Sequence, residues 1–279
     1  MAAGTLYVVA TPIGNLEDVT LRALRVLREV DLIAAEDTRR TRTLLGRHGI
    51  ARPLTSYYDA VERDRAPAIV ARLQAGASVA LVSDAGTPGI ADPGYHLVRG
   101  ALAAGVPVVP VPGPSALTAL VSVAGFPAER FVFEGFLPSR PGPRAVRLAA
   151  LAREPRALVF FEAARRLAPF LAAAEAALGD RETAVARELT KRHEEVLRGT
   201  LAELAERVAA MGRVRGEVTI LVGARAAPEV PPATPDLDAR IRTARAAGRS
   251  VADLAAEIAR ETGVPRRAVY RRALALERT

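Results

Sequence analysis

Short apolar segments alternate with longer amphipathic segments along most of the chain. The short segments are rich in Val, Ile, Leu and Ala and have the length of buried strands. In the longer ones, apolar residues such as Leu21, Leu24 and Leu27 recur every three or four positions between arginines, which predicts amphipathic helices. This alternation is typical of βαβ units with a parallel sheet. We expect strands at 5–10, 31–35, 78–83, 107–111, 157–162, 183–188 and 217–223, and helices at 21–28, 60–75, 93–104, 143–153, 164–177 and 200–210.

The order of these elements indicates an α/β protein with two consecutive αβα domains. The segment at 126–138 interrupts the alternation and marks a change of pattern between the two halves. We therefore predict one domain over 1–115 and a second over 116–225. Four prolines within 226–236 then predict a stiff linker. A small helical appendage over 237–279 follows it.

This appendage has the spacing of a helix–turn–helix pair. Val251, Leu254 and Ile258 repeat at helical spacing, a turn follows at 262–265, and a second helix begins after it. From Asp236 onward there are ten arginines against six acidic residues. Two interpretations stay open: an appendage that binds RNA, or a solvated helix pair at a dimer contact. The candidate RNA-binding residues lie on the second helix and are Arg266, Arg267, Arg271 and Arg272.

The charge balance points in the same direction. With 39 basic against 31 acidic residues, the chain has a formal net charge of +8 and is expected to attract polyanions such as RNA or DNA. Composition drift is the alternative, because every basic residue except Lys191 is an arginine and alanine is abundant, as in proteins from GC-rich genomes.

Several classes of protein are excluded by what the chain lacks. It has no cysteine, so disulfides, thiolate zinc sites and cysteine nucleophiles are excluded, and a reducing cytoplasm fits. The most apolar stretch, 106–126, has four prolines in its first nine residues and cannot form a membrane helix. The N-terminus lacks the basic start of a signal peptide. The three histidines do not have the spacing of metal ligands. We expect a soluble cytoplasmic protein without a metal.

Three loops rich in glycine and proline each follow a predicted strand, at 10–15, 83–94 and 111–116. In a parallel sheet, loops at the carboxyl ends of the strands line the ligand crevice. Glycine lets the backbone approach a ligand closely, and proline stiffens the loop. Neither a GxGxxG nor a GxxxxGK[ST] motif occurs, so a standard dinucleotide site or P-loop is disfavoured. The loops predict a nucleoside-like ligand held largely by backbone groups; tight turns and helix caps are the alternative interpretation.

Several long motifs resemble a known family. They are the segments at 6–24 and 31–45, the block VALVSDAGTPGIADPGY at 79–95, and the segments at 112–117, 130–138 and 186–195. Over roughly residues 4–224 the chain is similar to the tetrapyrrole methylase superfamily, and within it to the ribosomal small subunit methyltransferase I group. The resemblance implies a class III S-adenosylmethionine methyltransferase with the cofactor in the cleft between two αβα domains. It also implies a homodimer that methylates a ribose 2′-hydroxyl of a cytidine in the decoding region of 16S rRNA.

The resemblance also implies a set of cofactor-binding residues. The strand ends of the second domain, near Phe161 and Ala186, would close the site. Two stretches depart from the family pattern: 161–166, which is close to Tyr-Glu-Ser-Pro-His-Arg in the family, and 58–61, which tends to be rich in His and Asn. The implied cofactor residues are Pro12, Gly14, Asp84, Gly86, Thr87, Pro88, Gly89, Ser115, Ala116, Glu162, Ala163, Arg187 and Glu188.

Two polar clusters could assist methyl transfer to a ribose hydroxyl, which is a poor nucleophile unless a base takes its proton or a cation stabilises the alkoxide. Glu36, Asp37 and Arg39 end a predicted strand and open a helix, although an Asp there is also an ordinary N-cap. Lys191 ends a strand of the second domain, where it could lower a hydroxyl pKa or hold a phosphate. The alternative interpretation is that Lys191 only forms a surface salt bridge with Glu194 or Glu195. The identity of the base stays open.

Two other functions stay open beside rRNA methylation on the 30S subunit. The acceptor could be a tetrapyrrole carbon, although a small macrocycle does not need the positive field of the appendage. The protein could also be a non-catalytic RNA-binding assembly factor with a relic cofactor pocket.

Overall fold

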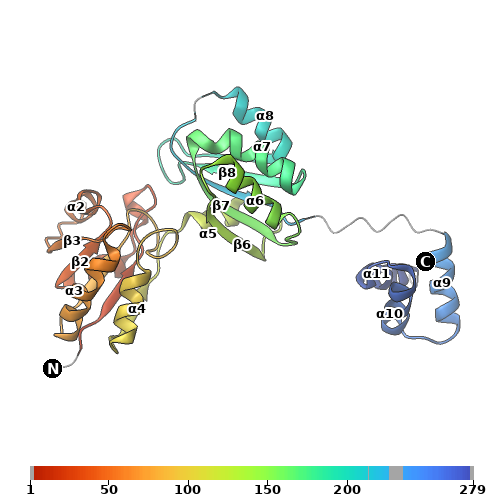
Figure 1. Ribbon diagram of the computed structural model, residues 1–279, viewed down its shortest axis with the longest axis horizontal. Coiled ribbons are helices and arrows are strands. Elements are labelled where there is room, and N and C mark those ends of the chain that lie inside the picture. The colour runs from red at the N-terminus through yellow and green to blue at the C-terminus, as the bar shows by residue number, and fades with distance from the viewer. Residues whose placement is uncertain (1–2, 213, 226–234, 277–279) are drawn as a thin grey trace. The chain divides into compact units, whose positions relative to one another are not determined.

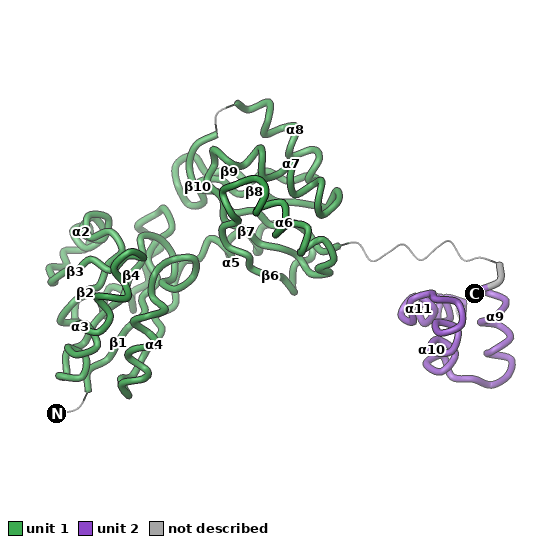
Figure 2. Tube along the Cα trace, viewed as in Figure 1, with its two compact units in different colours: residues 1–225 green, residues 226–279 purple. Residues whose placement is uncertain are grey.

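The computed structural model describes residues 3–212, 214–225 and 235–276. The chain divides into two compact units, 1–225 and 226–279 (Figure 2). The first unit contains two five-stranded sheets with helices packed on them, and the described part of the second unit is helical (Figure 1). The predicted α/β fold with a helical appendage is therefore confirmed.

The first sheet is parallel throughout, as predicted. Its strands are β1 (Leu6–Val9), β2 (Leu32–Ala35), β3 (Leu54–Ser56), β4 (Val79–Val82) and β5 (Val108–Val111). Its helices are α1 (Leu21–Glu29), α2 (Thr38–Arg47), α3 (Glu62–Gln74) and α4 (Tyr95–Ala103). The strand order is β3-β2-β4-β1-β5. Because β4, β1 and β5 are neighbours, the loops that follow them meet at one edge of the sheet.

Alternation along the buried strands explains how both faces of this sheet are covered. In β2, Ile33 and Ala35 pack in a core cluster with residues of α1 and α2. Leu32 and Ala34 pack in a second cluster with residues of α3 and α4. Because successive side chains of a strand point to opposite faces, a continuous apolar run is what a sheet covered on both faces requires.

The second sheet has the strand order β6-β7-β10-β8-β9. Its strands are β6 (Phe131–Phe136), β7 (Ala157–Ala163), β8 (Glu182–Arg187), β9 (Glu195–Thr200) and β10 (Glu217–Val222). Its helices are α5 (Ala116–Val123), α6 (Pro141–Leu151), α7 (Leu167–Leu178) and α8 (Leu201–Ala210). Helices α6, α7 and α8 pack on one face, and α5 packs on the other.

The expectation of a parallel sheet is wrong for this second half. Only β6 and β7 pair in parallel, whereas β10 is antiparallel to both β7 and β8. The cause is β9, which the apolar pattern did not predict because charged residues and a glycine interrupt the apolar residues of EVLRGT. It follows β8 as the return strand of a hairpin and reverses the chain direction. The crossover through α8 then places β10 in the same reversed direction.

The second unit has its own core. Its helices are α9 (Pro235–Ala246), α10 (Val251–Thr262) and α11 (Arg266–Leu276), so the predicted helix pair has a third helix before it. Leu237, Ile241 and Leu254 are among the buried residues that join them. Helix α10 ends at Gly263, whose left-handed backbone (φ 72°) terminates it. Most of the predicted linker, 226–234, lies outside the described residues.

Within the described residues, none of the helices combines the length and the apolar character that crossing a lipid bilayer requires.

Candidate active site

The three predicted loops follow β1, β4 and β5 at the carboxyl edge of the first sheet. The first two are joined directly, because Thr11 and Gly86 exchange backbone hydrogen bonds of 2.8 and 3.0 Å. The Thr11 hydroxyl also donates to the backbone oxygen of Ser83 at 3.0 Å. Gly86 has a φ of 80°, which glycine adopts without strain. The loops therefore form one stiff wall.

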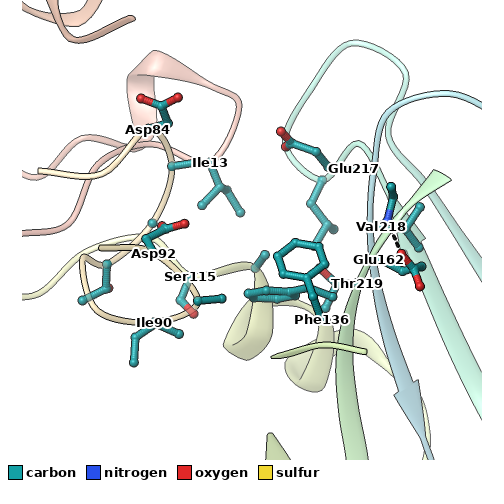
Figure 3. Close-up of a pocket in the computed structure, with 18 of the residues that line it drawn as sticks. Ile13, Asp84, Ile90, Asp92, Ser115, Phe136, Glu162, Glu217, Val218 and Thr219 are labelled. Carbon is teal, nitrogen blue, oxygen red and sulfur yellow. Dashed lines mark hydrogen bonds between the residues drawn. The ribbon is translucent and has the colours of Figure 1, made fainter. Parts of the chain in front are cut away.

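A cavity of about 380 Å³ lies between this wall and the second sheet, within the unit 1–225. In Figure 3, Asp84, Asp92 and Ser115 lie on the side of the loops, and Phe136 and Thr219 lie opposite them. The lining residues of the first side are Ile13, Glu36, Arg40, Asp84, Ala85, Gly86, Thr87, Ile90, Ala91, Asp92, Ser115 and Ala116. Those of the other side are Phe136, Phe161, Glu162, Ala163, Ala186, Leu189, Gly216, Glu217, Val218 and Thr219.

The side of the cavity formed by the loops is acidic. The backbone N–H of Asp84 donates to Glu36 at 3.0 Å, and Arg40 lies 3.5 Å from the Asp84 carboxylate. Burial raises the pKa of Glu36 and of Asp84 above the ordinary values. For Asp92, burial and then the nearby Glu36 carboxylate raise the pKa to about 7. This side therefore favours a ligand that carries positive charge.

The opposite side of the cavity is mostly apolar. The rings of Phe136 and Phe161 lie 5.7 Å apart at a tilt of 59°, and Leu189 is a further apolar residue of the lining. Glu162 is buried, and its Oε1 accepts from the N–H of Ala163 at 2.7 Å and from Arg166 at 2.6 Å. Aromatic rings with an exposed face suit a planar heterocycle.

A second cavity of about 250 Å³ adjoins the first and shares five lining residues with it. The shared residues, which we call the partition, are Ile13, Arg40, Asp84, Ala85 and Glu217.

Gly14 and Lys191 also line the second cavity. A Cβ on Gly14 would lie 2.5 Å from the Cγ of Lys191, so only glycine allows this close approach. Lys191 donates to Glu188 at 3.0 Å and to Glu217 at 2.9 Å. Burial disfavours its charge, but the two carboxylates outweigh burial and raise its pKa. Lys191 thus forms a salt bridge, but with Glu188 and Glu217 rather than with Glu194 or Glu195 as considered from the sequence.

The structure gathers most of the predicted site residues around these two cavities. Pro12, Gly14 and Lys191 line the second cavity, and Asp84 lines both. The first cavity is also lined by the predicted residues Glu36, Gly86, Thr87, Ser115, Ala116, Glu162 and Ala163.

Six predicted residues are absent from the described lining of both cavities: Asp37, Arg39, Pro88, Gly89, Arg187 and Glu188.

Each of these residues has a clear local role where the structure shows its contacts. Asp37 caps α2, accepting from the N–H of Arg39 at 2.8 Å and pairing with its guanidinium at 2.7 Å. The guanidinium of Arg39 holds the pKa of Asp37 down at about 2. Meanwhile the N–H of Asp37 donates to Asp84 at 2.9 Å, so this cap positions a lining residue. Arg187 pairs with Glu195 at 3.1 Å.

Of the predicted RNA-binding residues, Arg266, Arg267 and Arg271 are exposed on α11. Arg272 differs, because its Nε donates to Asp238 of α9 at 2.8 Å. No group of three or more His, Asp and Glu side chains that could hold a metal ion occurs in the part of the chain that the structure describes.

Sequence reasoning missed several lining residues. Arg40, Asp92 and Phe136 lie within the motifs that carry the family resemblance, but nothing in the sequence distinguishes them from the neighbouring residues as lining residues. The sequence does not mark Glu217 and Thr219 as site residues. They lie on β10, whose run of apolar residues is like that of any buried strand. Only the pairing of β10 in the second sheet shows that its first residues reach the cavity.

Comparison with known proteins adds independent evidence. The family described as Tetrapyrrole (Corrin/Porphyrin) Methylases matches residues 5–205, and the RsmI C-terminal HTH domain matches residues 231–277. A relative from Mesorhizobium japonicum, named Ribosomal RNA small subunit methyltransferase I, is 48% identical over 98% of this chain and 92% of its own. A relative of the same name from Thermotoga maritima is 47% identical over 80% of this chain and 99% of its own.

Solved structures of low sequence identity share the fold. Uroporphyrin-III C-methyl transferase from Thermus thermophilus, complexed with S-adenyl homocysteine, superimposes with a TM-score of 0.56 at 23% identity, covering 78% of this chain and 97% of its own. The methyltransferase CobJ gives a TM-score of 0.61 at 23% identity, covering 82% of this chain and 98% of its own. Because the family profile covers the first sheet and four of the five strands of the second, and relatives of about 48% identity cover nearly the whole chain, the protein belongs to the tetrapyrrole methylase family.

Proposed function

We propose that this protein transfers a methyl group from S-adenosylmethionine to the ribose 2′-hydroxyl of a cytidine in the decoding region of 16S rRNA. The observation that carries the proposal is the similarity to relatives named Ribosomal RNA small subunit methyltransferase I, which extends over 98% of the chain and includes the second unit. The two joined cavities supply a physical basis for it.

The larger cavity fits S-adenosylmethionine. Its volume of about 380 Å³ falls within the range of about 300–1,000 Å³ of small-molecule sites. The cofactor carries a sulfonium and an ammonium, which match the acidic side formed by Glu36, Asp84 and Asp92. Its adenine ring matches the tilted rings of Phe136 and Phe161. We assign the cofactor to this cavity and the acceptor nucleoside to the second one.

When bound, the cofactor supplies an electrophilic methyl group. The residues of this chain align the two reactants across the partition, and alignment alone can lower a barrier by about 7–11 kcal/mol. We assign the proton-accepting role to Asp84, because it borders both cavities and burial makes it a stronger base than an exposed carboxylate. The 2′-oxygen would give its electron pair to the methyl carbon while the methyl–sulfur bond breaks and its electrons stay on the sulfur of the leaving S-adenosylhomocysteine. The hydroxyl proton would pass to the Asp84 carboxylate. Arg40 and the N–H of Asp37 hold that carboxylate in place.

The other predicted catalytic residues act around this group in our proposal. Glu36 accepts from the backbone of Asp84 and fixes the start of the second loop. Lys191 positions Glu217 and packs against Gly14 in the lining of the second cavity. Arg39 orients Asp37, which caps α2. A role for Arg187 and Glu188 in cofactor binding remains a prediction, as do the homodimer and the cytoplasmic location.

We assign rRNA docking to the unit beyond residue 236, separate from the domains 1–115 and 116–225. Its core is independent of the sheets, and three of its predicted RNA-binding arginines are exposed. A truncated chain that ends at 225 should keep its affinity for S-adenosylmethionine. It should bind 30S subunits more weakly and with a flatter salt dependence.

The decisive experiment is methylation of purified 30S subunits by the full chain with S-adenosylmethionine. Primer extension at limiting nucleotide should detect a new ribose mark at one cytidine of the decoding region. Calorimetry on the same preparation measures cofactor binding. If the chain methylated a tetrapyrrole added in a parallel reaction and left the 30S subunits unmarked, the C-methyltransferase alternative would be favoured. Absence of any cofactor binding would contradict both enzymatic functions.

A further inference from the structure

A surface groove of about 790 Å³ continues from the second cavity. The two share Gly14, Leu16 and Lys191 in their linings. The second cavity in turn shares the partition with the first. The three hollows therefore adjoin one another in a row from the proposed cofactor site to the surface of the unit 1–225, and we call this row the path.

The groove differs in charge from the cavity at the other end of this path. Arg47, at the end of α2, and Arg192, after β8, are exposed in its lining. Among the described residues, neither guanidinium has a hydrogen bond or ion pair, whereas Arg40 of the cavity lining pairs with Asp84. Within the part of the lining that the structure describes, Glu17 is the one acidic residue. An unpaired guanidinium binds phosphate well because its planar fork can donate two parallel hydrogen bonds.

The loop that carries Arg192 is held in a strained conformation. Glu188 and Thr190 have φ angles of 53° and 63°, which are uncommon for residues with a Cβ and especially for a β-branched one. The hydroxyl of Thr190 accepts from the N–H of Asn15 at 3.1 Å, which ties this loop to the first loop of the other sheet. Strain of this kind persists where the surroundings fix it, and it clusters at binding and catalytic sites. One wall of the groove is thus rigidly placed.

We propose that this groove binds the RNA strand on either side of the acceptor nucleotide, with backbone phosphates on Arg47 and Arg192 and the acceptor nucleoside in the second cavity past Gly14. The proposal rests on the function proposed above and adds an RNA contact in the first unit. A reactive ribose must come within bonding distance of the methyl group, so the strand that carries it has to follow the path that opens there. Phosphates along that path would then meet the two free guanidinium groups, which are the donors suited to them.

The test uses the full chain with Arg47→Glu and Arg192→Glu combined, and a control with Arg72→Glu and Arg207→Glu. The control makes the same change of charge on exposed positions of α3 and α8, away from the groove. Filter binding to 30S subunits over a salt series and methylation kinetics are measured for both. Calorimetry with S-adenosylmethionine shows that the cofactor site is intact. Thermal unfolding compares the folding of the two variants, and Arg47→Gln with Arg192→Gln replaces the first pair if it unfolds.

For the groove variant we expect the KM for 30S subunits to rise about tenfold or more, because hydrogen bonds to charged groups are lost. The slope of log affinity against log salt should fall by about one for each phosphate contact removed. Cofactor affinity and the control should stay unchanged. An unchanged slope in the groove variant would overturn the proposal. If binding became weaker while the slope stayed unchanged, the two arginines would contact a partner that is not a polyanion. A wild-type chain that binds 30S subunits without methylating them would overturn the proposed function instead, while the slopes would still decide the groove.

Discussion

The two sides of the cofactor cavity are built by different means. On the side of the parallel sheet, loops at the ends of β1, β4 and β5 supply carboxylates and backbone groups. On the side of the mixed sheet, lining residues such as Phe161 and Thr219 lie on the strands themselves. The first side offers charge and fixed hydrogen bonds, whereas the second offers a largely apolar surface. The difference follows from topology, because a parallel sheet collects its loops at one edge.

This difference indicates a division of labour across the cavity. Residues of the loops should mainly affect the rate of methyl transfer and the pH dependence of cofactor binding. Residues of the mixed sheet should mainly affect the affinity for the cofactor through contact area. Variants on the two sides can therefore separate turnover from binding.

The largest effect is expected for Asp84→Asn. The amide keeps the size of the side chain and one acceptor oxygen but cannot take the proton of the acceptor hydroxyl, so kcat should fall about 100-fold or more. The affinity for 30S subunits should change little, and the affinity for the cofactor should fall by a smaller factor than kcat, because one of the three carboxylates that face its positive charges becomes neutral. Single-turnover methylation separates these quantities. Asp64→Asn on α3 is the matched control, because its carboxylate is exposed. A rate for Asp84→Asn close to that of the control would remove Asp84 from the mechanism.

On the opposite side, Phe161→Ala should weaken cofactor binding about tenfold, since stacking on an aromatic ring is worth about 1–3 kcal/mol per base. The control is Phe133→Ala. Its ring lies 4.9 Å from that of Phe161 but is not in the described lining of the cavity, so both variants lose packing and only one loses the surface that faces the ligand. Calorimetry measures the affinity. Equal weakening in both variants would mean that Phe161 acts through packing alone.

The same contrast explains how far the sequence could predict the site. Gly14, Asp84 and Ser115 were predictable, because glycine and proline after a strand have a direct conformational meaning. Thr219 and Phe136 were not, because residues that line a cavity from within a strand obey the same apolar pattern as core residues. The direction of β10 depended on the hairpin of β8 and β9. The formation of a strand as polar as β9 depends on pairing with its partner strand rather than on an apolar pattern of its own.

On the loop side, a smaller effect is expected in the pH dependence of the affinity for the cofactor. The pKa of Asp92 is about 7 before the cofactor binds, and a nearby sulfonium favours the ionised carboxylate, so binding should release a proton near that pH. Affinity should accordingly rise as the pH increases through about 7 and fall below it. Calorimetry in two buffers of different ionisation enthalpy counts the proton. In Asp92→Asn the dependence should disappear. Binding of S-adenosylhomocysteine, which lacks the sulfonium charge, should release a smaller fraction of a proton. An affinity of the wild type that is constant across this range would contradict the placement of the cation.

The smallest effect separates two kinds of arginine in the second unit. Arg272 joins α11 to α9 through Asp238, whereas Arg271 beside it is exposed. Arg272→Ala should therefore speed amide hydrogen exchange in α9 and α11 and lower the melting temperature by a few degrees at most, because a solvent-accessible ion pair stabilises weakly. Arg271→Ala should leave exchange unchanged and reduce the salt dependence of 30S binding by about one unit of slope. The two variants remove the same charge from neighbouring positions, so any difference between them reports the ion pair. If both reduced the slope equally and neither changed exchange, α11 would be a uniform RNA-binding surface, and the contact with Asp238 would not hold the three helices together.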